Sequence, residues 1–111
     1  MNTEDLIISL MNDINANLDS IIKSMPHRLI TPLNYDQISE MHKATRSLQQ
    51  RFEEQLKQLH PSSWVSHCIT LNEQYKSTLA SIHSKMIKYL MDELTSAELI
   101  QNIDSNKSGP Y

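Results

Sequence analysis

The chain has a single glycine, Gly109, among its 111 residues. Tight turns between strands, and loops that hold phosphate groups, need glycine where the backbone takes positive φ or approaches a ligand closely. Valine, which strands favour, also occurs once, at Val65. The sequence therefore predicts an all-α fold. Its length suits one domain with a modest core, predicted over 1–103 and followed by a flexible C-terminal tail over 104–111.

Apolar residues that recur every three or four positions predict the first two helices. The first is expected over 3–24, with Thr3 as the N-cap residue. The second is expected over about 34–60, where Asn34 and Gln37 have the spacing of a capping box. Prolines follow both segments and end them. The predicted core positions of the second helix are Ile38, Met41, Thr45, Leu48, Phe52, Leu56 and Leu59.

A third helix is expected from Ser62 or Ser63, and it is the longest segment. Thr95 and Glu98 have the spacing of another capping box, so we expect a break there and a short fourth helix to about Ile103. The predicted core positions of the third helix, again three or four residues apart, are Val65, Cys68, Asn72, Tyr75, Leu79, Ile82, Met86 and Tyr89.

Short connections between long helices favour antiparallel neighbours. The apolar stripe of the second helix is narrow, as in a coiled coil. The sequence therefore predicts an antiparallel three-helix bundle with coiled-coil character and a short C-terminal fourth helix.

The segment HPSSWVSHC, residues 60–68, contains the only tryptophan and the only cysteine. His60, His67 and Cys68, with His83, are candidate zinc ligands. However, adjacent helical residues point about 100° apart, and His83 lies about four turns further on. We therefore interpret the segment as a corner between helices, with Trp64 over the end of the bundle and Cys68 in the core. No metal or cofactor is predicted.

Other patterns also argue against an enzyme. A nucleophilic Cys68 would need a histidine that faces it, and its neighbour His67 does not. The carboxylate pair Glu53–Glu54, like Asp92–Glu93, lies on a polar helix face, where Glu53 is placed to pair with Lys57.

Two further histidines, His42 and His83, each stand beside a predicted core position rather than on it. We expect both to flank the core or to lie in solvent, with no role as ligands.

The formal net charge of −3 gives no general reason to expect nucleic-acid binding. One alternative remains, a nucleic-acid-binding regulator that uses a basic patch on the second helix, at Lys43, Arg46, Arg51 and Lys57. The N-terminus has acidic residues where a signal peptide has basic ones, and no apolar run is long enough to span a membrane. We therefore expect a cytoplasmic protein without a membrane partner.

The strongest functional signal is the crowding of apolar residues near the end of the third helix, around more than half of its circumference. One buried face cannot absorb them all, so the sequence predicts a protein-binding surface at Met86, Ile87, Tyr89, Leu90, Met91 and Leu94. The alternative is that the 26–33 loop or the fourth helix covers them.

The predicted function is a non-catalytic interaction module, such as an adaptor, an assembly subunit or a small secretion or export chaperone. It would bind another protein or itself, as a homodimer, by helix-in-groove recognition. A structural coiled-coil subunit of a larger complex is a further alternative.

Overall fold

The computed structural model describes the backbone of residues 2–107 and the side chains of residues 2–99. The helices are α1 (Thr3–Lys23), the short 3-10 helix η1 (Pro26–Arg28), α2 (Tyr35–Leu56) and α3 (Ser63–Lys107). The prediction of an all-α chain is confirmed, since the described residues form three α-helices and no strand.

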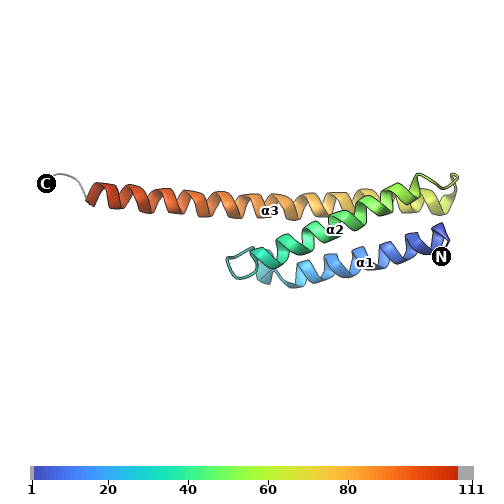
Figure 1. Ribbon diagram of the computed structural model, residues 1–111, viewed down its shortest axis with the longest axis horizontal. Coiled ribbons are helices and arrows are strands. Elements are labelled where there is room, and N and C mark those ends of the chain that lie inside the picture. The colour runs from blue at the N-terminus through green and yellow to red at the C-terminus, as the bar shows by residue number, and fades with distance from the viewer. Residues whose placement is uncertain (1, 108–111) are drawn as a thin grey trace.

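The three α-helices lie side by side over the first half of α3, and they alternate in direction (Figure 1). Helix α2 packs against both α1 and α3. The second half of α3 extends past the loop that joins α1 to α2, so the molecule measures 75 × 22 × 21 Å.

The predicted core face of α3 is confirmed. Its positions from Val65 to Met86 are all buried, and Tyr89 is half-buried. On α1 the buried residues again recur every three or four positions: Ile7, Leu10, Ile14, Leu18 and Ile21. These residues join Phe52 and Leu56 of α2 in one apolar cluster.

The predicted core face of α2 is confirmed at Ile38, Thr45, Phe52 and Leu56, but the buried face is shifted at two other positions. Met41 and Leu48 are only partly buried, whereas their polar neighbours His42 and Gln49 are buried. Both polar side chains have partners on α3, because His42 bonds a backbone carbonyl and Gln49 bonds a side chain. His42 is therefore a core residue, contrary to the prediction.

Two predicted helix caps are also corrected. Asn2, not Thr3, caps α1, and its Oδ1 accepts a hydrogen bond from the backbone N–H of Asp5 at 2.8 Å. Asn34 precedes α2 but makes no side-chain cap. Its buried side chain instead accepts from the backbone N–H of Thr31 at 2.8 Å and donates to the carbonyl oxygen of Ser24 at 2.9 Å. Asn34 thereby holds the α1–α2 loop closed.

The α1–α2 loop contains two residues in the left-handed region, His27 with φ 56° and Arg28 with φ 59°. Such a conformation favours glycine, because a Cβ atom crowds the following carbonyl oxygen there. The loop therefore turns at a cost in free energy that a glycine would reduce.

The expected break at Thr95 is not found, and α3 continues as one helix to Lys107. The chain has neither glycine nor proline between Pro61 and Gly109, so nothing forces the helix to end. The predicted tail over 104–111 therefore begins inside α3, and residues 108–111 lie outside the described residues.

Candidate interaction surface

The corner between α2 and α3 has the structure that the sequence predicts for an ordinary helix start. The Oγ atom of Ser62 accepts from the backbone N–H of Val65 at 3.1 Å. Cys68 is fully buried against the other helices, and Trp64 lies at the end of the molecule with about a third of its surface exposed. The segment is thus a capped helix start with one buried thiol.

No group of three His, Cys, Asp or Glu side chains among the described residues is arranged to hold a metal ion. Burial raises the pKa of the Cys68 thiol, which disfavours the thiolate that nucleophilic chemistry requires. Cys68 packs as a small apolar residue in this core.

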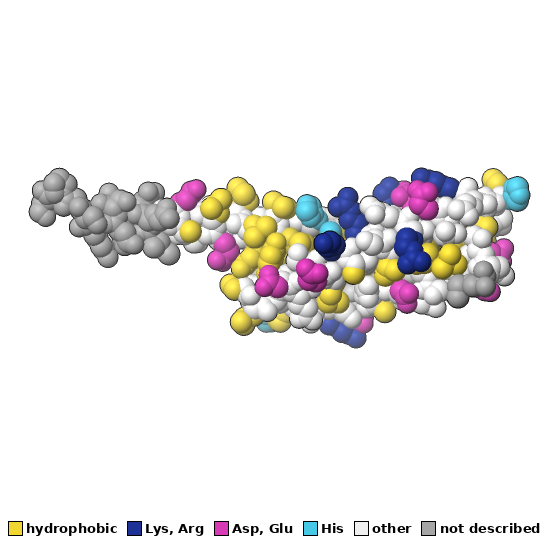
Figure 2. Space-filling model, viewed as in Figure 1, with side chains coloured by type: hydrophobic (Ala, Val, Ile, Leu, Met, Phe, Trp, Pro, Cys, Tyr) yellow, Lys and Arg dark blue, Asp and Glu magenta, His cyan; other side chains and the backbone are white. Residues whose placement is uncertain are grey.

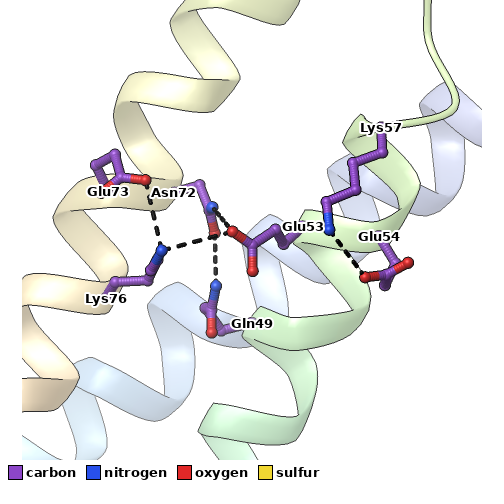
Figure 3. Close-up of polar contacts among 7 residues, drawn as sticks. All are labelled: Gln49, Glu53, Glu54, Lys57, Asn72, Glu73 and Lys76. Carbon is purple, nitrogen blue, oxygen red and sulfur yellow. Dashed lines mark hydrogen bonds and ion pairs between the residues drawn. The ribbon is translucent and has the colours of Figure 1, made fainter.

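Carboxylates on α2 form a polar layer with α3 (Figure 3). Gln49 donates to Oδ1 of Asn72 at 2.8 Å, and Nδ2 of Asn72 donates to Glu53 at 3.3 Å. Glu53 also pairs with Lys76 at 3.6 Å. The predicted pair with Lys57 does not form, because Lys57 contacts Glu54 at 3.2 Å. Glu53 therefore holds α2 to α3 instead of lying on a fully solvated face.

A groove of about 490 Å³ lies along the junction of α2 and α3, next to this polar layer. On its α2 side, Nε2 of His42 lies 2.9 Å from the carbonyl oxygen of Leu79; a carbonyl only accepts, so Nε2 carries the hydrogen. The ring of His42 stacks on that of His83, with centroids 5.8 Å apart. Small Ala80 leaves the α3 side of the groove open, and Arg46 lines the α2 side.

The six predicted partner-binding residues divide into two groups. Met86 is buried in the core of its own chain. Tyr89 is half-buried and stacks on Tyr35, the first residue of α2, with ring centroids 5.0 Å apart. These two residues therefore stabilise the chain itself and are not free to bind a partner.

The other four predicted residues are exposed and lie together where α3 leaves α2. Their exposed fractions are 46% for Ile87, 44% for Leu90, 58% for Met91 and 57% for Leu94. We call these four residues the α3 patch. Hydrophobic side chains gather in this region in Figure 2, next to histidine and basic side chains over α2 and α3.

The α1–α2 loop meets α3 on a different face from the α3 patch and leaves the patch uncovered. The Nζ atom of Lys85 donates to the carbonyl oxygen of Arg28 at 3.1 Å, and Tyr89 shares a shallow groove with Leu29. Leu33 is 97% exposed and adds an apolar side chain at the same end of the hairpin. Leu33 belongs to the 26–33 loop that was a possible cover for the apolar residues of α3, yet its own side chain is open to solvent.

The predicted basic patch on α2 is interrupted. Lys57 is engaged by Glu54. Lys43, Arg46 and Arg51 are exposed, and among the described residues none of the three makes an ion pair. Of these cations, Arg46 lines the α2–α3 groove.

None of the helices has, within the described residues, an apolar stretch of the length that crossing a membrane requires. Comparisons of the sequence with family models and with curated proteins, and of the fold with solved structures, found no match.

Proposed function

We propose that this protein is a non-catalytic interaction module that associates with another protein, or with itself, through the α3 patch. The observation that supports this proposal is that Ile87, Leu90, Met91 and Leu94 are exposed together on α3, which extends beyond α1 and α2. Exposed apolar side chains that cluster on one helix face are typical of helix–helix recognition surfaces.

The surroundings of the α3 patch support this proposal. Leu29 and Leu33 of the α1–α2 loop are also well exposed, but the loop meets another face of α3, so the patch remains open to solvent on its own side. Met91 adds a flexible side chain that adapts to irregular partners. An adaptor, an assembly subunit or a small export chaperone would use such a surface.

A structural subunit of a larger helical assembly is a second candidate. It is favoured by the length of α3, whose portion beyond Tyr89 spans about 27 Å at 1.5 Å per residue. In that role the whole projecting portion would be an interface, and the α3 patch would be its first part.

The test compares Leu90→Asp with Leu94→Asp in one chain against Ile8→Asp with Ile22→Asp in another. Ile8 and Ile22 are about half exposed on α1, so the control adds the same charges at similar exposure away from the patch. Both variants should keep the helicity and melting temperature of the wild type. Only the first should lose association, measured as molar mass by light scattering and as co-purification of a partner from cells.

If both variants associate as the wild type does, the α3 patch is not the binding surface. If the first variant unfolds while the control stays folded, the two leucines belong to the core of the chain, and the proposal fails for that reason.

A further inference from the structure

The α3 patch belongs to a longer stripe that continues towards the N-terminus of α3. Its members recur at spacings of three and four, so they share one face of the helix, beside the core face. They are Lys76, Ala80, His83, Ile87, Met91, Leu94 and Glu98. The first three line the α2–α3 groove, and the last three lie on the projecting part of α3. We call this set the outer stripe.

The outer stripe is symmetric in its spacing about Ile87. Met91 and His83 each lie four residues from Ile87, and Leu94 and Ala80 each lie seven residues from it. Glu98 and Lys76 likewise lie at equal distances on opposite sides. When two such helices run antiparallel and cross at Ile87, every member of the stripe therefore meets its counterpart.

We propose that two copies of this chain pair through the outer stripes of their α3 helices, antiparallel, with a two-fold axis at Ile87. The projecting part of each α3 then lies along the α2–α3 groove of the other copy and packs there as a fourth helix against α2 and α3. This inference rests on the proposed function, because it names a second copy as the occupant of the α3 patch.

Side-chain sizes match across this pairing. Leu94 of one copy meets Ala80 of the other, where the groove of about 490 Å³ is open. Met91 meets His83 and its small neighbour Ser84, and Ile87 meets itself on the axis. At Leu94 and Ala80 a large side chain on the projecting half thus faces a small one on the grooved half, the arrangement that lets helices interdigitate without voids.

The charges match in the same register. Glu98 of one copy meets Lys76 of the other. The described side chains beyond Tyr89 include three acids, Asp92, Glu93 and Glu98, and no lysine or arginine. The groove offers Lys76 and Arg46, although Glu53 and Glu73 already offset Lys76 in part. An acidic segment therefore approaches a groove in which Arg46 has no ion pair among the described residues.

A parallel pair in register lacks these matches. It would place Glu98 against Glu98 and Lys76 against Lys76, and like charges in contact are unfavourable. It would also leave Ala80 facing Ala80, so the groove in each copy would stay open. The complements of the projecting half are found in the same chain, which favours a second copy as the occupant of the groove.

Cysteine cross-linking tests the register in the full chain, with Cys68→Ala removing the native thiol. Ile87→Cys should give disulfide-linked dimers in a glutathione buffer, because the two positions meet on the axis. Leu94→Cys alone should not, since its two copies would lie about 21 Å apart along the helices, beyond the roughly 7 Å between Cα atoms that a disulfide spans. A mixture of Leu94→Cys chains with Ala80→Cys chains should cross-link to each other.

A charge exchange provides the second variant. Glu98→Lys should weaken the dimer about tenfold in Kd, measured by analytical ultracentrifugation, and adding Lys76→Glu should restore most of the loss. Glu4→Lys is the matched control, because Glu4 is an exposed carboxylate on α1. It should leave Kd within about twofold of the wild type.

Three results would overturn the pairing. A wild-type chain that stays monomeric over a hundredfold concentration range excludes it, and self-cross-linking of Leu94→Cys shows either a parallel pair or an axis away from Ile87. Failure of the Lys76→Glu exchange to restore the dimer, in a chain that keeps the wild-type melting temperature despite losing the pairs of Lys76 with Glu53 and Glu73, shows a different register. The proposed function is judged separately. If the chain is a monomer that captures another protein through Leu90 and Leu94, the proposed function stands and the homodimer is excluded. If the chain is a monomer without such capture, both proposals fail.

Discussion

Gln49 on α2 donates a hydrogen bond from Nε2 to Oδ1 of Asn72 on α3, with the two atoms 2.8 Å apart and both residues buried. Neither side chain can turn to water without opening the contact between the helices. A buried polar pair of this kind fixes how two helices align, because any slip leaves both groups without partners.

Replacing one partner should therefore cost more than replacing both. Gln49→Leu or Asn72→Leu alone should lower the free energy of unfolding by about 1–3 kcal/mol, since each leaves a buried amide without its partner. The double variant should recover part of that loss, since it still lacks the bond from Asn72 to Glu53. Urea denaturation of the four chains measures the coupling, and strictly additive losses would mean that the two amides do not depend on each other.

Asn34 should contribute far more to the free energy of unfolding than Gln37, the other residue of the predicted capping box. Asn34→Ala removes hydrogen bonds to the backbone of Thr31 and Ser24 from a buried side chain, and should cost about 1–3 kcal/mol. Gln37→Ala changes an exposed side chain and should stay within about 0.5 kcal/mol of the wild type. Equal losses in thermal melts would restore the capping-box interpretation.

The turn after α1 offers a route to higher stability. Arg28→Gly should raise the free energy of unfolding by up to about 1 kcal/mol, because relief of the left-handed backbone outweighs the entropy that glycine adds to the unfolded chain. Arg28→Ala keeps the Cβ atom and is the matched control, expected to show no gain. Chemical denaturation distinguishes the two, and a loss of stability in the glycine variant would contradict the account of this turn.

Stability should fall in mildly alkaline solution because of Cys68. Burial raises the pKa of its thiol above the ordinary value of 9.0, so the folded chain keeps the proton when the unfolded chain loses it. The contribution is fully present below the unfolded pKa and is lost as pH rises through the folded pKa. Cys68→Ala should therefore show a smaller decline than the wild type as pH rises through and above 9.0.

Tyr75 has a raised pKa for the same reason, but its ordinary value of 10.0 places its effect at higher pH. Urea unfolding at each pH gives the difference in free energy of unfolding between the wild type and Cys68→Ala. This difference isolates the contribution of the thiol. Identical pH profiles for the two chains would show that the thiol titrates alike in the folded and unfolded states.

The core of α3 could be predicted from the sequence because its buried positions, from Val65 to Met86, keep an unbroken spacing of three and four. The face of α2 could not be predicted in the same way. The spacing pattern identifies four of its buried positions correctly. It also selects Met41 and Leu48, whereas their neighbours His42 and Gln49 are buried instead. Their burial depends on partners that lie on α3, and a one-helix pattern does not contain that information.

The candidate surface was predictable in its place and only partly in its members. The crowding of Ile87, Leu90 and Leu94 exceeds what one core face holds, and all three are exposed. Tyr89 was assigned to the same surface, but its ring stacks on Tyr35. That contact depends on how far the hairpin reaches along α3, which is set by the turn at Asn34 and not by the sequence of α3 itself.

The projection of α3 beyond its neighbours has a consequence for local unfolding of the chain. The side chains of 92–99 are exposed, so only local propensity holds that stretch helical, and short unsupported helices are marginal in water. Amide protons there should exchange with deuterium through fraying alone. Those of 65–86 must wait until packed helices separate. A partner that binds the projecting turns also slows their amide exchange. The measured free energy of binding therefore includes the free energy of stabilising this part of the helix.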